Sequence, residues 1–304
     1  MSNLKRVLES GQFAVTAELG PPRDADALVV IEKAGLLKGQ SDAVNITDNQ
    51  TAIVRMSSIA AAKLLIDQGL EPVVQMTCRD RNRLAIQADI LGAAALGVKN
   101  LLCLTGDHQK FGDHPQAKGV WDLDSIQLLQ MVKTMRDDKK LMGGQEMAVA
   151  PNLFIGAAEN PFADPFEARA RRLAKKVAAG AQFIQTQIVY NVPKFERWME
   201  EVRALGLDKK TYIMAGISPL KGAGMARYMK NNVPGMDVPD EYIERMTRAK
   251  DEGRSPKEEG IAIAVELIEK MKTIPGVAGV HVMAIEWEEA VPDIIKGAGL
   301  FPRP

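Results

Sequence analysis

The sequence is poor in the residues that build metal clusters and disulfide frameworks. Its 304 residues include two cysteines and three histidines, and aromatic residues make up 5% of the chain. Two separated cysteines cannot supply a structural zinc cluster or a disulfide framework. Cys78 and Cys103 lie near or within apolar segments, which is typical of cysteines that pack as small hydrophobic side chains. The three scattered histidines argue against a histidine-based metal site, so we expect no metal.

Net charge and long hydrophobic runs are also missing. The 39 lysines and arginines balance 39 acidic residues, which gives a formal net charge of zero. A balanced chain lacks the basic footprint of a general nucleic-acid binder. No run approaches the roughly 18 apolar residues of a membrane-spanning helix, and the N-terminus has no long apolar signal segment. We therefore expect a cytoplasmic protein that neither binds nucleic acid nor inserts into a membrane.

What the sequence does contain is a repeated unit of a short apolar run, a polar turn and an amphipathic stretch. The apolar runs begin at residues 13, 42, 72, 100, 152, 182, 211 and 279. Most intervals between them are close to the roughly 30 residues of one βα unit, and the longer ones follow the fourth and seventh runs. The pattern predicts an α/β fold, with residues 1–304 forming one (β/α)8 barrel that has extra helices after the seventh strand. A doubly wound open sheet is the alternative, because periodicity does not distinguish an open sheet from a closed one.

Helical patterns lie between the apolar runs. Residues 56–68 and 84–96 are amphipathic, and Gly97 and Gly180 stand where helix C-caps belong. The methionine-rich segment 126–135 has apolar residues at helical spacing, which predicts a helix packed on the core.

Polar residues close most of the predicted strands at their carboxyl ends. In a barrel these ends meet at one mouth, where active sites lie. Glutamines within apolar strands need hydrogen-bond partners, so Gln75 and Gln187 either bond to other polar groups in the barrel or serve a ligand. The convergence of the whole set predicts a binding site at the mouth. Glu18 and Asp107 are its acids, and the set holds no ready nucleophile.

A basic run covers residues 169–176, in the helix predicted after the fifth strand. Its plainer interpretation is a solvated helix face. The alternative is that side chains in the first turn of this helix hold a phosphate-bearing cofactor.

Five short motifs occur in the following order: TAELGPP at 16–22, NITDN at 45–49, QMTC at 75–78, LTGD at 104–107 and QTQ at 185–187. Together they resemble the 5,10-methylenetetrahydrofolate reductases, over nearly the whole chain. The resemblance implies a flavin-dependent (β/α)8 barrel that reduces 5,10-methylenetetrahydrofolate to 5-methyltetrahydrofolate by hydride transfer from reduced flavin. The chain is similar to the single catalytic-domain form. Its segment VMAIEWE at 282–288 resembles the branch from anaerobic bacteria that works with a small partner subunit.

The resemblance also implies roles for single residues. Glu18 matches the general acid of the family, Asp107 matches the acid near the flavin and the folate, and Gln187 matches a folate contact. Glu18, Asp107 and Gln187 thus form the expected substrate site. Cofactor contacts are expected at Thr47, Asp48, Gln75, Thr105, Gly106, Asp107, Trp121, Asp122, Asn160 and Lys176.

Several positions depart from the family pattern. Gln75 stands where many members have histidine, Thr105 where some have arginine, and Glu286-Trp287 where some bacterial forms have an Asn-Arg pair. These departures leave open whether the flavin is FAD or FMN, and whether NAD(P)H or a partner protein donates the electrons. The oligomeric state, including a homo-oligomer, and the physiological direction of the reaction also stay open.

Two alternative functions remain at this stage. One is a folate-binding barrel of the methyltransferase type, which needs no flavin. The other is a barrel subunit that docks onto an electron-delivery partner, with the acidic segment 285–289 and the helices around 236–271 as its surface. Segment 285–289 more simply begins the last helix, where acidic residues favour the helix dipole.

Overall fold

A closed barrel of parallel strands forms the centre of the structure, a computed structural model that describes residues 1–233 and 235–303. The strands pair in chain order, and the last strand returns to pair with the first. Within the described residues the barrel strands are β1 Ala14–Leu19, β2 Ala43–Ile46, β3 Pro72–Thr77, β4 Asn100–Leu104, β5 Phe154–Glu159, β6 Phe183–Ile188, β7 Tyr212–Ile217 and β8 Val277–Val282.

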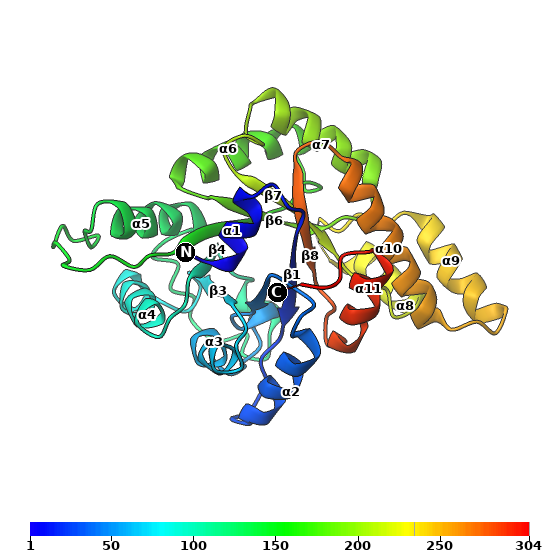
Figure 1. Cartoon of the computed structure of the whole chain (residues 1–304), viewed down its shortest axis with the longest axis horizontal. Helices are drawn as coiled ribbons and strands as arrows, with labels where there is room; N and C mark the ends of the chain where they lie inside the picture. The colour runs from blue at the N-terminus through cyan, green and yellow to red at the C-terminus, as the bar shows by residue number, and fades with distance from the viewer. Residues whose placement is uncertain (234, 304) are drawn as a thin grey trace.

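Helices surround the barrel on its outside, except for the first helix, which lies across one end of the barrel (Figure 1). They are α1 Asn3–Glu9, α2 Ala27–Leu37, α3 Ser58–Asp67, α4 Arg83–Ala95, α5 Ser125–Asp137, α6 Arg169–Ala179, α7 Val192–Ala204, α8 Ala223–Asn232, α9 Asp240–Asp251, α10 Pro256–Thr273 and α11 Val291–Gly297. Short 3-10 turns are η1 Gln50–Ala52, η2 Gln109–Phe111, η3 Phe166–Ala168 and η4 Glu288–Ala290. The predicted (β/α)8 barrel is confirmed, and α8, α9 and α10 are its extra helices after β7. Barrel closure excludes the open-sheet alternative.

The strands form where the sequence predicted them, each beginning within two residues of the expected position. Strands β1, β2 and β3 are buried at every position. Burial on both faces is the environment of parallel strands covered by helices, and it explains why their sequences are continuous apolar runs rather than alternating ones.

Local signals fix several helix ends. The carboxylate of Asp124 caps α5 and forms a capping box with Gln127. Gly97 and Gly180 follow α4 and α6 with φ angles of 98° and 119°, so both C-cap predictions are confirmed. Helix α5 covers segment 126–135 and buries its leucines and methionines, as expected of a core helix.

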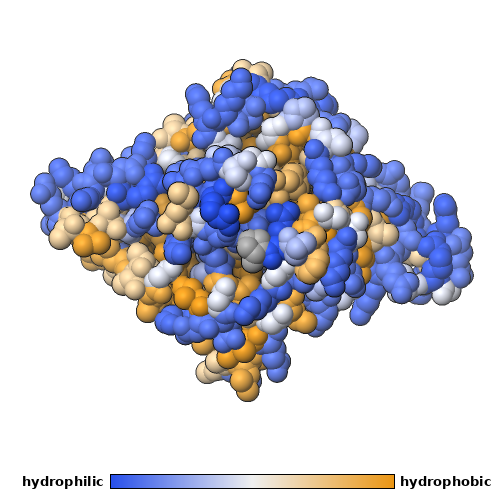
Figure 2. Space-filling view, viewed as in Figure 1, coloured by the Kyte–Doolittle hydropathy of each residue, from blue (hydrophilic) through white to orange (hydrophobic). Residues whose placement is uncertain are grey.

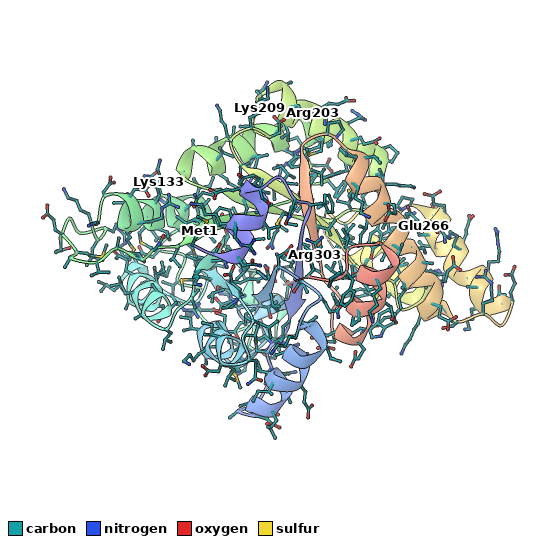
Figure 3. All side chains as sticks on the ribbon, in the orientation of Figure 1. Met1, Lys133, Arg203, Lys209, Glu266 and Arg303 are labelled. Atoms are coloured by element: carbon teal, nitrogen blue, oxygen red, sulfur yellow. The ribbon has the colours of Figure 1, made fainter. Side chains whose placement is uncertain are left out.

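The end of the barrel opposite the mouth is filled by aromatic rings. The rings of Phe154 and Phe183 stack with centroids 5.0 Å apart, in a cluster that also contains apolar side chains of α1. Gly156 makes room for this stack, because a Cβ there would lie 2.2 Å from the ring of Phe183. Outside the stack lies Arg303, which is labelled in Figure 3. Arg303 donates hydrogen bonds to the Phe13 carbonyl and to the buried carboxylate of Asp42.

The outer surface is mainly hydrophilic on the face seen in Figure 2, and hydrophobic residues gather toward the end where α2 lies. Leu28 and Leu36 of α2 are exposed. Among the helices of residues 1–233 and 235–303, none has the length and hydropathy that crossing a lipid bilayer requires.

Candidate active site

A cavity of about 470 Å³ lies at the carboxyl ends of the barrel strands. This volume is in the range of small-molecule binding sites. Six of the residues predicted for the site line it: Glu18, Gln75, Thr105, Asn160, Lys176 and Gln187. Because they come from strands β1, β3 and β6, from the loops after β4 and β5 and from α6, only the closed barrel brings them together.

The remaining predicted residues lie outside this lining. They are Thr47, Asp48, Gly106, Asp107, Trp121 and Asp122, from the loops that follow β2 and β4. Asp107 is exposed, and its carboxylate accepts a hydrogen bond from the backbone N–H of Thr51 at 2.9 Å. The structure thus gathers Glu18 and Gln187 in one cavity and carries Asp107 on the adjoining loop.

Glu18 sits near the end of β1 with 9% of its surface exposed. Its Oε2 accepts a hydrogen bond from Nε2 of Gln75, on β3, at 3.2 Å. Nε2 of His281, on β8, lies 3.6 Å from the same oxygen. Three strands that are distant in the sequence therefore hold one carboxyl group in the cavity.

Beneath Glu18, a layer of polar side chains crosses the interior of the barrel. Asn45 and Gln185 exchange two amide hydrogen bonds of 2.6 and 3.0 Å. Gln185 also donates to the hydroxyl of Thr16 at 3.0 Å, and that hydroxyl contacts Nδ1 of His281 at 3.0 Å. Gln185 thus satisfies its buried amide within the barrel, where burial without partners would be costly.

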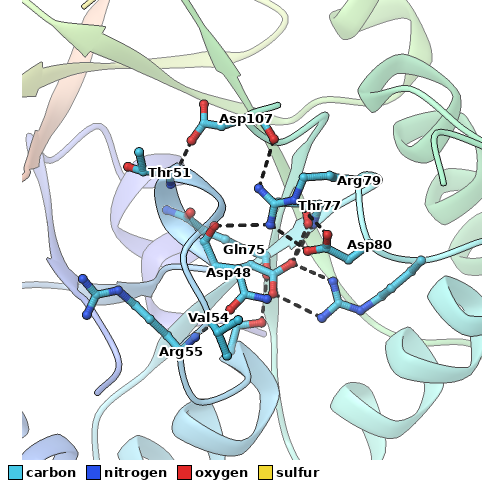
Figure 4. A network of polar contacts seen from close by, with 12 residues as sticks. Asp48, Thr51, Val54, Arg55, Gln75, Thr77, Arg79, Asp80 and Asp107 are labelled. Atoms are coloured by element: carbon cyan, nitrogen blue, oxygen red, sulfur yellow. Dashed lines mark hydrogen bonds and ion pairs between the residues drawn. The ribbon is translucent and has the colours of Figure 1, made fainter. Parts of the chain in front are cut away.

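Asp48 is buried and serves as a structural acceptor at the end of β2 (Figure 4). Its Oδ2 accepts hydrogen bonds from the N–H and the hydroxyl of Thr77 at 2.9 and 3.0 Å. The guanidinium of Arg81 pairs with it at 2.7 Å. The hydroxyl of the preceding residue, Thr47, is buried without a hydrogen-bond partner in the described part of the chain, so it is a group that a ligand could satisfy.

Arg79 joins the loops that follow β2, β3 and β4 (Figure 4). It donates to the backbone carbonyls of Asp107 at 3.1 Å and Asn49 at 3.2 Å. Hydrogen bonding to Asp80 raises the pKa of this guanidinium despite its burial. The sequence analysis missed Arg79 and Arg81, although charged residues directly after a barrel strand are a usable signal for this end of the fold.

Backbone strain is concentrated in the loops at the mouth. Asn49, Thr51 and Ala52 after β2, and Ile285 and Glu286 after β8, have positive φ angles between 29° and 57°. Such angles cost free energy for residues with a Cβ, and the cost is greatest for β-branched side chains. Tertiary contacts hold these loops in place, and one of them joins the two loops, a salt bridge of 3.0 Å from Arg55 to Glu286.

The loop after β4 is also constrained. Gly106 has a φ of 90°, and a Cβ there would lie 3.0 Å from Cβ of Thr77, so this position favours glycine. Trp121 has a φ of 47° and is 38% exposed. Arg83 pairs with Asp122 at 2.7 Å and lowers the pKa of that carboxyl to about 2.

A cationic wall closes the cavity on the side of β5 and α6. Nζ of Lys176 lies 2.8 Å from Oε2 of Glu159, and both side chains are at least nine-tenths buried. Burial lowers the pKa of Lys176, and Glu159 opposes that shift. Arg169 and Arg172, from the first turn of the same helix, line the cavity as well. Helix α6 continues directly from the 3-10 turn η3, so the cations of this wall are side chains.

In TIM-barrel enzymes, polar side chains converge on a cavity at the carboxyl ends of the barrel strands. The closed barrel and its cavity have this arrangement and define the class of the protein as a TIM-barrel enzyme. A family model described as "Methylenetetrahydrofolate reductase" matches residues 3–299. The chain belongs to the methylenetetrahydrofolate reductase family, which confirms the resemblance seen in the motifs.

Relatives agree with this membership. Methylenetetrahydrofolate reductase 1 of Schizosaccharomyces pombe is 26% identical over 77% of this chain and 37% of the relative. A 5,10-methylenetetrahydrofolate reductase of Pectobacterium carotovorum is 23% identical over 96% of this chain and 92% of the relative. The chain spans between about a third and a half of the length of the eukaryotic relatives it matches.

A solved structure shares the fold. It is described as an uncharacterized protein from Clostridium thermocellum that binds two copies of 5-methyl-5,6,7,8-tetrahydrofolic acid. The TM-score is 0.65 at 13% identity, and the match covers 98% of this chain and 100% of that chain.

Proposed function

We propose that this protein reduces 5,10-methylenetetrahydrofolate to 5-methyltetrahydrofolate, with a reduced flavin as the hydride donor. The observation that carries the proposal is the carboxyl of Glu18, held in the cavity by Gln75 and approached by His281. Family membership and the folate bound by the Clostridium protein of similar fold support the choice of substrate. The electron donor to the flavin is then NAD(P)H or a partner protein.

The cavity suits a flavin nucleotide in the chemistry of its walls. Leu104 and Met283 supply apolar surface for a ring system. Arg169 and Arg172 would supply donors for a phosphate. Lys176 is engaged by Glu159, so we assign it to the electrostatics of this wall and the two arginines to phosphate contact. A flavin bound there would supply the hydride chemistry.

Glu18 is the proposed general acid. The methylene carbon of the substrate bridges N5 and N10, and this ring must open before a hydride can reach the carbon. Opening requires a proton at N10, and a positioned carboxylic acid can donate it. Gln187, whose side chain lines the same cavity, would orient the pterin by hydrogen bonds. Asp107 accepts hydrogen bonds from the N–H of Thr51 at its carboxylate and from Arg79 at its backbone carbonyl. Its carboxylate would stabilise the cation formed at N5.

The test is the substitution Glu18→Gln. Folate reduction is expected to fall at least 100-fold, because general acid catalysis typically contributes 10²–10⁴-fold. Flavin binding and flavin reduction are expected to stay near wild type, since Gln keeps the shape of the side chain. Anaerobic stopped-flow absorbance separates the two half-reactions by following flavin bleaching with the donor and recolouring with methylenetetrahydrofolate.

Glu146→Gln is the matched control, because this side chain is 83% exposed and belongs to no part of the cavity. Recolouring of the Glu18→Gln protein at the wild-type rate would contradict the assignment of the acid. A purified protein without flavin absorbance that neither FAD nor FMN restores would contradict the flavin.

A further inference from the structure

Arg79 contacts three loop segments at the barrel mouth, yet the proposed reaction assigns it no role. It lies two residues after β3, and its side chain is 3% exposed. Nη1 donates to the backbone carbonyl of Asp107 at 3.1 Å and Nη2 to that of Asn49 at 3.2 Å (Figure 4). The carbonyl of Arg79 itself accepts the N–H of Val120 at 2.8 Å. One buried residue therefore joins the loop after β2 to both ends of the long loop after β4.

The carboxylate of Asp107 is the exposed end of this network. Its Oδ2 accepts the N–H of Thr51 at 2.9 Å. Because Thr51 is two residues after Asn49, the chain and three hydrogen bonds form a closed ring through Arg79, the loop after β2 and Asp107. Asn49 and Thr51 have φ angles of 47° and 57°, which residues with a Cβ adopt only when surrounding contacts hold them. The ring supplies such contacts and fixes the direction of the carboxylate.

The charge of Arg79 is neutralised by its neighbour in the chain. Nε and Nη2 donate to the two carboxylate oxygens of Asp80 at 2.8 and 2.6 Å. Within residues 1–233 and 235–303 the ion-pair partner of Arg79 is Asp80, and the guanidinium reaches Asp107 at its backbone carbonyl instead of its carboxylate. Among the described residues no donor is bonded to Oδ1 of Asp107. A fixed carboxylate with a free oxygen is suited to stabilise a cation on a substrate.

We propose that Arg79 is a positioning residue for Asp107, an inference that rests on the proposed function. Arg79 holds the backbone of Asp107 in place, and the N–H of Thr51 sets the rotamer of its carboxylate. Asp80 keeps the guanidinium from forming an ion pair with that carboxylate. The cation at N5 then meets a charge whose position is set before the substrate binds, so little reorganisation accompanies ring opening. Arg79 keeps its protons and touches no reacting atom.

The first test reads the arrangement without any turnover. ¹⁵N-threonine labelling gives a spectrum in which Thr51→Ser identifies the Thr51 amide by its loss. In the wild-type protein this amide is expected to exchange slowly with solvent, because it is bonded to the carboxylate of Asp107. Asp107→Ala and Arg79→Met are each expected to raise its exchange rate at least about tenfold. A Thr51 amide that exchanges at the same rate in the wild-type and Arg79→Met proteins overturns the inference.

The second test is a double-mutant cycle in the folate half-reaction. Asp107→Asn removes the charge, and the rate of flavin recolouring at saturating folate is expected to fall about 100-fold, as for the loss of one preorganised electrostatic group. Arg79→Met is expected to lower this rate at least about tenfold, because a misplacement of about 1 Å can reduce a rate about 100-fold. Since Arg79 acts through Asp107, the double variant is expected to be no slower than Asp107→Asn alone. Losses that multiply in the double variant overturn the inference.

Arg79→Lys separates the geometry of the hydrogen bonds from the charge. Lysine keeps the positive charge, but its ammonium lacks the planar fork that bonds two carbonyls and Asp80 together. The recolouring rate of Arg79→Lys is therefore expected to stay close to that of Arg79→Met. Recovery of the wild-type rate by Arg79→Lys overturns the positioning role. If Arg79→Met does not fold, Arg79→Lys takes its place in the amide exchange and in the double-mutant cycle.

Arg136 provides the matched control. Its side chain is 18% exposed, pairs with the next residue, Asp137, and donates to the carbonyl of Leu153 at 3.3 Å. These contacts are of the same kind as those of Arg79, but Arg136 does not line the cavity. Arg136→Met is expected to lower the free energy of unfolding and to leave the recolouring rate unchanged. Flavin binding and bleaching are expected to stay near wild type in Arg79→Met, and loss of flavin binding there overturns the inference by placing Arg79 in the cofactor site.

The outcomes separate the two proposals. A protein whose Thr51 amide depends on Arg79 but that reduces no methylenetetrahydrofolate overturns the proposed function, and with it the reaction that Arg79 serves. A wild-type protein that reduces methylenetetrahydrofolate, together with an Arg79→Met protein of equal recolouring rate, overturns only the role of Arg79.

Discussion

Lys176 both lines the cavity and pairs with the buried carboxylate of Glu159. The resemblance predicts that Lys176 contacts the cofactor, and in the structure its side chain lines the cavity. Its ammonium is nevertheless already paired with Glu159 and donates to the carbonyl of Ala158. Burial of an unpaired ammonium or carboxylate would cost several kcal/mol, so each partner makes the other tolerable.

This pairing predicts a large loss on single substitution. Lys176→Met leaves Glu159 buried and without its partner, and the free energy of unfolding is expected to fall by about 3–5 kcal/mol. The double change Glu159→Gln with Lys176→Met removes both charges and is expected to recover most of that loss. Urea denaturation of the two single variants and the double variant measures the coupling. Additive losses would show that the two side chains do not depend on each other.

At the level of helices, two glycines with the same backbone role should respond in opposite ways. Gly92 lies inside α4, and nothing lies within 4 Å of the place of its Cβ. Gly260 lies inside α10, where a Cβ would come 1.8 Å from the carbonyl oxygen of Leu220. Helix propensity favours alanine at both positions, so packing alone distinguishes them.

We therefore expect Gly92→Ala to raise the free energy of unfolding by about 0.5–1 kcal/mol. Gly260→Ala is expected to lower it, because α10 must move away from the segment that follows β7. Thermal denaturation of both variants provides the comparison. Stabilisation by Gly260→Ala would mean that α10 is not held against Leu220.

The strands and helices were the part of the structure that the sequence predicted best. Strand runs and their spacing were sufficient because a buried parallel strand must be apolar on both faces, which few other elements are. Glu18 and Gln187 were found by the same reasoning, since a polar residue at a strand end has only the mouth to face. The position of Asp107 could not be predicted this way. It depends on loops with positive φ angles and on a bond to Thr51, which no periodicity encodes.

Contacts that exist only after the barrel closes were beyond prediction. His281 and Glu18 meet because β8 pairs with β1, the last strand of the barrel with the first. The sequence offered His281 as one of three scattered histidines, without a sign of its neighbour. The alternation of side chains along a strand was an available clue to which residues share the barrel interior. Side chains two residues apart point to the same face, as those of Thr16 and Glu18 do.

At the scale of the whole molecule, Arg303 ties the C-terminal segment to the beginnings of β1 and β2. Its guanidinium lies 3.1 Å from the carboxylate of Asp42 and donates to Phe13. Burial raises the pKa of Asp42, and Arg303 works against that shift. The charged form of Asp42 therefore costs the folded state free energy at neutral pH, and Arg303 reduces the cost.

Arg303→Ala is accordingly expected to lower the free energy of unfolding by about 3 kcal/mol at pH 7, as for a buried ion pair that loses one partner. The loss should shrink as the pH falls, because Asp42 is protonated in both states once the pH is below its unfolded pKa of 3.8. It should grow as the pH rises through the raised folded pKa. Urea denaturation at pH 4, 5.5 and 7 tests this trend, and a loss independent of pH would assign the effect to packing.

The ring of Phe183 occupies the space that a side chain at position 156 would need. Neither position can change alone without either overfilling the barrel or leaving a void. Across related sequences the two sites should therefore trade volume, with a larger residue at 156 accompanied by a smaller one at 183. A library randomised at both positions and selected for folding should recover such compensating pairs and few others. Related sequences would then show a correlation between the residue volumes at these two positions, which lie on adjacent strands.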